Sequence, residues 1–468
     1  FVVHTEQPFT NKIIKYFNIL ANFESNTAKN YFLKKIGIKV IMGILLAVSF
    51  ACSEDKCENH SATVHLEETK NGFRLIRNGE PYYIKGGAAS PTFLEELKEA
   101  GANTARIYDT LYLQRTLDKA HSLGLAVVVD IPLPKVYIAE EYYEKDELFH
   151  LVKSKVEPLV KKFHDHPALL YWNLGNELYY PYLYEVSDFH ERYNELIDMV
   201  HEIDPNHPVS TTTIGANKSR VLSILARSPQ LDFISFNSFG VLSSFSDKLK
   251  PISPIWNGPH VIAEWGVNGP WEAKVTEWNA PIEETSTKKA EQIKNRYHNY
   301  LEPMKGDGSI GSFVFYWGAK NEYTPSWYSL FGENREKTQA VFELSQIWQS
   351  SKKEFPGPEL DYITLNEAGA IKSIILSPNE VATAEVILPK NKEQELKYDW
   401  EIRKESWFDT DISEKVSGIE FQLDSNKARF KTPKQEGPYR LFLYLTNGTE
   451  YYATANIPFY VLNPEHEE

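Results

Sequence analysis

The chain has little cysteine. Among its 468 residues only Cys52 and Cys57 occur, close together near the N-terminus. Two cysteines cannot build a disulfide framework or supply a thiolate metal site. We also expect no other metal site and no cofactor.

Positive charge is also in short supply. Lys and Arg number 50 against 64 Asp and Glu, which gives a formal net charge of -14. This balance disfavours nucleic acid as a partner, because the phosphate backbone is bound by clustered cations.

Aromatic residues make up 13% of the chain. Most of them will lie in the core, but aromatic faces also stack on sugar rings.

Near the N-terminus the apolar run Val40–Ala51 is too short to span a membrane. Lys34, Lys35 and Lys39 precede it, as in the charged region of a secretory signal. We expect residues 1–33 to lie outside the fold and residues 34–52 to form the signal peptide. A linker and a short hairpin should follow at residues 53–79.

The segment Val48–Cys52 resembles a bacterial lipoprotein box, and the acidic segment Ser53–Asp55 resembles the export tag of surface lipoproteins in the Bacteroidetes. The resemblance implies that Cys52 is lipidated. It also implies an exported bacterial lipoprotein at the outer membrane or cell surface, whose membrane contact is this anchor alone. An uncleaved anchor helix and a plain secreted protein remain open alternatives.

Residues 80–355 alternate short β-branched or aromatic runs with segments of helical spacing. Eight such repeats predict a (β/α)₈ TIM barrel. The helical pattern is weakest near Ser243–Lys250. The predicted strands are Tyr82–Ala89, Asn103–Tyr108, Ala126–Ile131, Leu169–Leu174, Val209–Thr213, Phe233–Asn237, Val261–Glu264 and Gly311–Trp317.

Segments of β character flank the predicted barrel. Val64–Arg77 reads as a hairpin with Asn71-Gly72 as its turn, and we expect it at the bottom of the barrel. Residues 356–468 carry short strands with turn signals, which predicts an immunoglobulin-like β-sandwich. Trp400 is its expected core anchor and Tyr439 a corner residue.

Two apolar runs end abruptly in a glutamate. Residues 171–177 read Tyr-Trp-Asn-Leu-Gly-Asn-Glu, and residues 261–266 read Val-Ile-Ala-Glu-Trp-Gly. On the strand count above, Glu177 ends the fourth strand and Glu264 the seventh, where the active sites of such barrels lie. A lone glutamate of this kind is usually a surface carboxylate. A pair of carboxylates can cleave a glycosidic bond.

These two strings resemble the catalytic domain of glycoside hydrolase family 2, within the retaining enzymes that place an Asn-Glu pair after strand four and the nucleophile after strand seven. The segment Arg106–Asp109 is also similar to β-1,3-glucan-acting relatives. The resemblance covers residues 80–350. It implies that Glu177 is the general acid/base and Glu264 the nucleophile, with their carboxyl groups only ~5 Å apart.

The resemblance also assigns supporting residues. Arg106 would keep Glu264 ionised, while burial and the neighbouring negative charge would keep Glu177 protonated. Asn176 would bind the sugar 2-hydroxyl.

Relatives often carry a tyrosine after strand six that hydrogen-bonds the nucleophile, whereas this chain reads Phe-Asn-Ser-Phe at residues 236–239. Either Asn237 takes that place, or Tyr108 or another hydroxyl does so from a different strand.

Several aromatic residues follow the last two strands. Trp317 matches the platform under the sugar in many relatives, although barrel-core packing is the alternative for it. The loop after strand seven carries Trp265, Trp271 and Trp278, and such long loops often build substrate subsites. Further candidates are Trp327 and Tyr328. The metal-like string His164–His166 falls in a turn at the opposite end of the barrel, where we expect no metal.

The sequence therefore predicts an exported, lipid-anchored retaining β-glycosidase that hydrolyses a poly- or oligosaccharide. A transglycosylase with the same site and a non-catalytic carbohydrate-binding lipoprotein are the alternatives. A third is a scaffold in which the sandwich binds a partner. The two intact glutamates favour an enzyme. The sugar, its linkage, exo or endo action and the oligomeric state stay undetermined.

Overall fold

The structure is a computed structural model that describes residues 63–70, 72–389, 395–406 and 413–463. The described residues up to Lys250 and from Gly258 onward form one compact unit. The predicted signal segment, Cys52 and Asn71 lie outside the described residues.

Eight parallel strands close into a barrel in the order β10-β11-β4-β5-β6-β7-β8-β9, which confirms the predicted fold. Several strands are buried along their whole length, as β6 is, because helices cover a parallel barrel. The strands are β4 (Ile84–Ala89), β5 (Thr104–Ile107), β6 (Ala126–Ile131), β7 (Leu169–Asn176), β8 (Val209–Ile214), β9 (Phe233–Asn237), β10 (His260–Trp265) and β11 (Ser309–Trp317).

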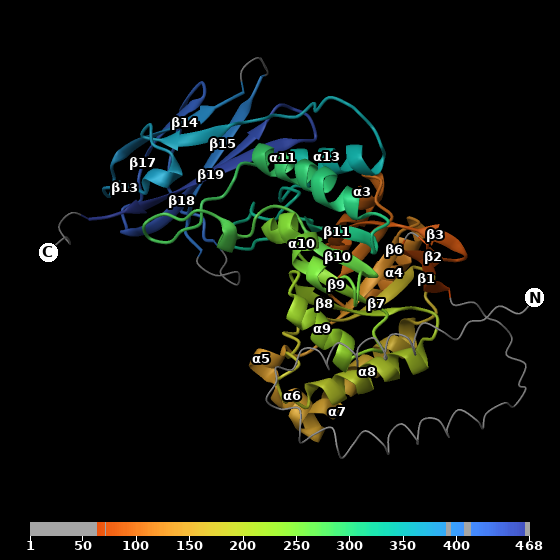
Figure 1. Cartoon of the computed structure of the whole chain (residues 1–468). Helices are drawn as coiled ribbons and strands as arrows, with labels where there is room; N and C mark the ends of the chain where they lie inside the picture. The colour runs from red at the N-terminus through yellow and green to blue at the C-terminus, as the bar shows by residue number, and fades with distance from the viewer. Residues whose placement is uncertain (1–62, 71, 390–394, 407–412, 464–468) are drawn as a thin grey trace, which may run out of the picture. The chain divides into compact units, whose positions relative to one another are not determined.

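Helices connect these strands, and one connection is short, as the pattern indicated. After β9 only a 3₁₀ turn (Gly240–Ser244) and α10 (Phe245–Leu249) precede residue 251. Figure 1 shows α11 and α13 lying side by side, with α11 against β19. The principal helices are α3 (Leu94–Glu99), α4 (Leu113–Ser122), α5 (Val136–Ala139), α6 (Glu141–Glu144), α7 (Asp146–Phe163), α8 (Phe189–Ile203), α9 (Lys218–Arg227), α11 (Ser286–Arg296), α12 (Glu302–Met304) and α13 (Gln339–Trp348).

The hairpin before the barrel is present as β1 (Val64–Thr69) and β2 (Gly72–Arg77), joined by β3 (Glu80–Tyr82). Val64 and Leu75 belong to the same buried cluster as Ile84, Leu170 and Val261. Those barrel residues lie at or near the first residues of their strands. The hairpin therefore closes the end of the barrel opposite to the strand ends that carry the glutamates.

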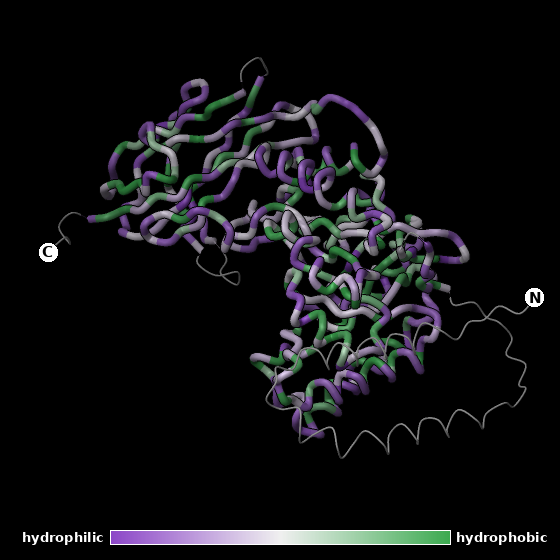
Figure 2. The backbone as a smooth tube through the Cα atoms, in the orientation of Figure 1, coloured by the Kyte–Doolittle hydropathy of each residue, from purple (hydrophilic) through white to green (hydrophobic). Residues whose placement is uncertain are grey.

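After the barrel, two four-stranded sheets form a β-sandwich. Figure 2 shows hydrophobic and hydrophilic residues alternating along its strands, as expected of sheets with one buried face. Trp400 is buried in its core, and the Tyr439 hydroxyl donates to the Gln435 carbonyl at 2.8 Å, as expected for a corner residue. The strands are β12 (Tyr362–Leu365), β13 (Ile374–Leu376), β14 (Val381–Ile387), β15 (Lys397–Lys404), β16 (Gln422–Asp424), β17 (Lys427–Lys431), β18 (Gly437–Thr446) and β19 (Tyr452–Val461).

A buried polar network joins the barrel to the sandwich. Glu283, just before α11, accepts hydrogen bonds from Lys289 of α11 and from Asn456 of β19. On β18, Arg440 donates to the Pro281 carbonyl at 2.8 Å and to Glu405. Because every one of these groups is buried and paired, the sandwich is held against the barrel by directional contacts.

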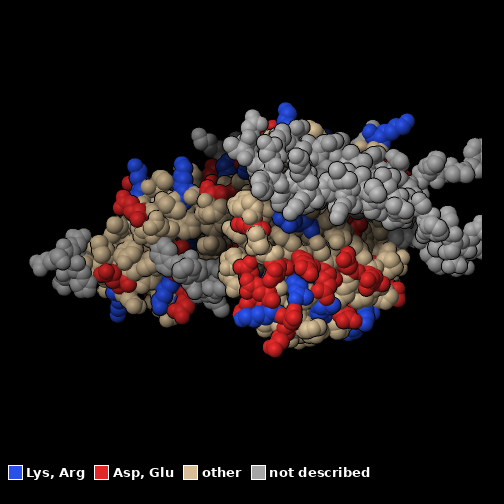
Figure 3. Space-filling model, turned by 60° about the horizontal axis from the view of Figure 1, so that its bottom comes forward, with Lys and Arg blue, Asp and Glu red and all other residues tan. Residues whose placement is uncertain are grey.

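On the face shown in Figure 3, Asp and Glu side chains gather in one area with fewer Lys and Arg among them. This distribution agrees with the net charge of -14. Within the described ranges, no helix combines the length and the apolar character needed to cross a membrane.

Candidate active site

Arg106 lies at the centre of the site, with none of its surface exposed. It extends from β5 and donates hydrogen bonds from two nitrogens to the Asp130 carboxylate of β6, at 2.7 and 3.0 Å. Its third nitrogen, Nη1, donates to Glu264 Oε1 at 3.2 Å and to Asn237 Oδ1 at 3.3 Å. A planar guanidinium with five donors therefore ties strands β5, β6, β9 and β10 together.

Glu264 of β10 is buried, with 6% of its surface exposed. The Tyr108 hydroxyl donates to its Oε1 at 2.7 Å. Of the two alternatives left open by the sequence, Tyr108 is the residue that contacts this carboxylate. The side-chain amide of Asn237 instead donates to the other glutamate, Glu177.

Burial raises the pKa of Glu264 to about 7, and the neighbouring Glu177 adds to the rise. Arg106 and the Tyr108 hydrogen bond act in the opposite direction. We expected Arg106 to keep Glu264 ionised. In the structure its charge is shared with Asp130, so it offsets only part of the cost of burying the carboxylate.

Glu177 follows β7 with a positive φ of 54°, and its backbone N–H donates to the Thr212 carbonyl at 2.9 Å. Asn237 Nδ2 donates to its Oε1 at 2.7 Å. Its side chain is 25% exposed, and Lys135 Nζ lies 4.0 Å from Oε2. The burial that we expected around Glu177 is instead found around Glu264.

Asn176 lies between Arg106 and Asn237. Its Oδ1 accepts from Arg106 Nη2 at 2.9 Å and from Asn237 Nδ2 at 3.1 Å. Two donors on one oxygen fix the orientation of the amide and leave its nitrogen facing the other way. That orientation is compatible with donation to a substrate hydroxyl, which stays a prediction.

Three contributors were missed by the sequence interpretation. Asp130 interrupts the apolar run of β6 one residue before the strand ends, a signal close to the one that singled out the two glutamates. Asn173 donates to Asp130 and accepts from Thr212 at 2.9 Å, which orients the carboxylate that holds Arg106. Lys135 gave no signal, since a lone lysine in a loop is ordinarily a solvated surface residue.

Two of the predicted sugar-binding tryptophans face away from the site. Trp317 is 0% exposed; its Nε1 donates to the Phe93 carbonyl at 3.1 Å, and its ring packs on Trp348 of α13. Trp265 is 1% exposed and contacts Tyr297. Successive strand residues point to opposite faces, so Glu264 facing inward places Trp265 outward. Neither indole offers a face to a sugar.

The other aromatic candidates differ in how far they are exposed to solvent. Trp271 is 65% exposed and meets Phe239 edge-on at 5.9 Å, and Phe239 in turn contacts Tyr328. Trp278 instead packs near Tyr460 of β19. Trp271 thus remains a candidate at the rim, with Tyr328 buried behind it. Trp327 is buried, with its Nε1 bonded to the Asn268 carbonyl at 2.9 Å.

His164 and His166 each face an aspartate, Asp165 and Asp118, both at 3.2 Å. Among the residues that the structure describes, no group of three or more His, Cys, Asp or Glu side chains could hold a metal ion.

A closed (β/α)₈ barrel with two glutamates at the ends of its fourth and seventh strands has the architecture of glycoside hydrolases. No family model matches the chain. The β-glucuronidases of Streptococcus agalactiae and Felis catus are each 25% identical to it, over 34% and 36% of this chain. The matched parts are 30% and 26% of those relatives, so the chain covers about a third of their length or less.

Among solved structures, a family 2 β-galacturonidase of Eisenbergiella tayi bound to galacturonate aligns with a TM-score of 0.47 at 15% identity. The alignment covers 62% of this chain and 55% of that one. The curated relatives that the chain resembles are thus glycosidases, the class of enzyme that the two motifs indicated.

Proposed function

We propose that this protein is a retaining β-glycoside hydrolase in which Glu264 is the nucleophile and Glu177 the general acid/base. The observation that carries the proposal is the chain of contacts between the two carboxylates. Asn237 bonds Glu177 and accepts from Arg106, and Arg106 donates to Glu264. The two roles follow from the positions of the glutamates, with Glu177 directly after β7 and Glu264 on β10, the fourth and seventh strands of the barrel.

The proposed reaction has two steps. The Glu264 carboxylate attacks the anomeric carbon while Glu177 gives its proton to the glycosidic oxygen, so the C–O bond breaks and a glycosyl-enzyme ester forms. Glu177 then removes a proton from water, which attacks the same carbon and releases Glu264. Tyr108 and Arg106 would hold the attacking oxygen in place and stabilise the departing carboxylate in the second step.

The test is hydrolysis of aryl β-glycosides and β-linked polymers by the wild type, with the first-formed anomer observed by NMR. β-Glucuronides head the panel because the relatives above are named for them. We expect the β-anomer first, and loss of turnover by at least about a thousandfold in Glu264→Gln. Glu191→Gln, an exposed glutamate on α8, is the matched control. An α-anomer formed first would contradict a retaining mechanism.

We further propose that the protein is exported and anchored through a lipid on Cys52. The lipoprotein-like segment Val48–Cys52 supports this proposal. Mass spectrometry of the mature N-terminus after bacterial expression should show a diacylglyceryl group on Cys52. Cys52→Ser should release the protein from the membrane fraction. A soluble wild-type protein would overturn the anchor without affecting the catalytic proposal.

A further inference from the structure

Exposed tyrosines gather on α5, which begins next to Lys135, and on the loop that begins with Glu177. Tyr137, Tyr179 and Tyr184 have 59%, 48% and 79% of their surfaces exposed, and Tyr182 is half-buried between them in sequence. We call these four residues the tyrosine platform. Large apolar groups left in water at one place usually mark a binding surface.

The rings of the platform form two contacting pairs. Tyr137 and Tyr179 lie 4.9 Å apart between ring centroids, and Tyr182 and Tyr184 stack at 5.6 Å with an interplanar angle of 12°. The Arg220 guanidinium lies under both pairs, 4.7 Å from the Tyr179 ring and 5.0 Å from that of Tyr182. These cation–π contacts hold the rings of Tyr179 and Tyr182 in defined positions.

The loop behind the rings is held just as firmly. Three side chains of α9 donate to backbone carbonyls of the loop after β7. Arg220 bonds Tyr180 at 3.1 Å, Ser223 bonds Pro181 at 2.7 Å, and Arg227 bonds Leu183 at 3.0 Å. A surface loop fixed in this way presents its exposed rings without further ordering cost, which favours ligand binding.

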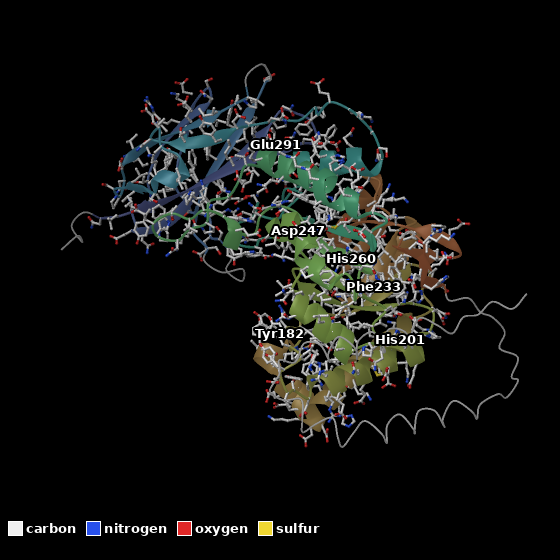
Figure 4. The ribbon with its side chains drawn as sticks, in the orientation of Figure 1. Tyr182, His201, Phe233, Asp247, His260 and Glu291 are labelled. Carbon is white, nitrogen blue, oxygen red and sulfur yellow. The ribbon has the colours of Figure 1, made fainter. Side chains whose placement is uncertain are left out.

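The platform begins beside the proposed acid/base. Tyr179 is two residues after Glu177, and Tyr137 is two residues after Lys135, whose ammonium lies 4.0 Å from Glu177. The Tyr137 ring of α5 contacts the ring of Tyr179, and Figure 4 labels Tyr182 on the same loop as Tyr179. A general acid must reach the glycosidic oxygen, so the sugar beyond that oxygen lies on the acid's side of the site.

We infer that the tyrosine platform binds the leaving-group side of a β-linked poly- or oligosaccharide, with sugar rings stacked on the tyrosine faces. The inference rests on the proposed function, because it takes Glu177 as the acid/base. It deepens that function by making a saccharide chain, rather than a glycoside with a small leaving group, the preferred substrate.

The experiment compares two substrates with the same sugar at the cleaved bond: its aryl β-glycoside and a soluble β-linked polymer that the wild type cleaves. In Tyr184→Ala and Tyr179→Ala we expect kcat/KM on the polymer to fall about tenfold further than on the aryl glycoside. Tyr362→Ala, an exposed tyrosine of the sandwich, should leave both values at the wild-type level. Equal losses on both substrates, or no loss, would overturn the inference.

Arg220 acts through the rings, as a positioning residue. Arg220→Met should lower the ratio of polymer to aryl-glycoside activity, and Arg220→Lys, which keeps a cation under the rings, should restore part of it. A general loss of folding would instead lower both activities alike in both variants.

A second measurement separates this inference from the proposed function. Calorimetry with Glu264→Gln and hexasaccharides of β-1,3-glucan, β-1,4-glucan, β-1,4-mannan and galactan tests binding without turnover. The comparison is between Glu264→Gln and the same variant that also carries Tyr184→Ala. If the wild type cleaves none of the substrates, but a hexasaccharide binds about tenfold more weakly when Tyr184→Ala is added, the proposed function fails and the platform stands as a saccharide site. If none of the hexasaccharides binds more weakly to that variant, the platform is not a saccharide site.

Discussion

The Tyr108 hydroxyl lies 2.7 Å from Oε1 of Glu264, and the Arg106 guanidinium carbon lies 4.7 Å from the Tyr108 ring centroid. One short strand, β5, with the residue that follows it, thus supplies both side chains that donate to the proposed nucleophile. The resemblance implied a tyrosine after strand six for this contact, and this chain has Asn237 there. The Tyr108 contact leaves Asn237 free to bond Glu177.

Replacing Tyr108 by Phe should remove one hydrogen bond to a charged carboxylate and preserve the ring. We expect kcat/KM to fall about tenfold or more. Since that hydrogen bond lowers the pKa of Glu264, the acidic limb of the pH–rate profile should also move to higher pH. Tyr112→Phe, on an exposed ring, is the control. An unchanged acidic limb would show that Tyr108 does not act on Glu264.

The pH dependence of the wild type should report Glu264 directly. Its raised pKa of about 7 means that the attacking carboxylate is half protonated at neutral pH in the free enzyme. We expect kcat/KM to rise with pH through an apparent pKa near 7. A limb near the ordinary glutamate value of 4.5 would contradict the effect of burial.

Stability should change with pH for the same reason. A carboxyl group whose pKa is raised in the folded state stabilises the fold below its unfolded pKa and loses this contribution as pH rises through the folded pKa. Between pH 4.5 and 8, the free energy of unfolding of Glu264→Gln should therefore gain about 3 kcal/mol relative to wild type. Denaturant unfolding at both pH values measures the difference, and a pH-independent difference would count against it.

Trp317 and Trp271 should respond in opposite ways to substitution. Trp317→Ala removes a fully buried ring and should cost about 3–5 kcal/mol of stability. Trp271→Ala changes an exposed ring and should leave stability within about 0.5 kcal/mol. If Trp271 binds substrate, its variant should raise KM. Thermal unfolding together with kinetics distinguishes the two, and a stable Trp317→Ala protein would contradict core packing.

The contact between barrel and sandwich should depend on Glu283. Burial by itself would raise the pKa of Glu283, but Lys289 and its hydrogen bonds hold that pKa below its usual value. Glu283→Gln should destabilise the protein by about 3–5 kcal/mol, because Lys289 then stays buried without a countercharge. Glu284→Gln, the exposed neighbour, should change stability by less than about 0.5 kcal/mol. Equal unfolding curves for both variants would refute a bracing role for this network.

All eight barrel strands were predictable because each is a short run rich in β-branched, aromatic or small residues, a pattern that needs no distant information. The placement of Glu177 and Glu264 followed from the same pattern, since parallel strands of a barrel end at one rim. The orientation of the tryptophan side chains was harder to predict. Trp317 and Trp265 stand next to the site in sequence, but which face of the strand they occupy depends on the twist and register of the closed barrel.

The tyrosine platform shows the same limit. The segment Tyr179–Tyr184 alternates exposed and buried rings, and nothing local distinguishes Tyr179, which faces solvent, from Tyr180, which is buried and bonded to Ser228. The difference comes from α9, which bonds the loop backbone from forty or more residues away in sequence.

The sequence by itself determined the barrel, the sandwich and the two strand-end glutamates, because hydrophobic periodicity and strand order are local properties of the chain. Only the tertiary structure decided that Tyr108 donates to Glu264 and that Asp130 shares the charge of Arg106. It also decided that Glu264, and not Glu177, is the buried carboxylate. Those relationships join β5, β6 and β10. Hydrogen bonds and desolvation act through space, between groups that the sequence keeps far apart.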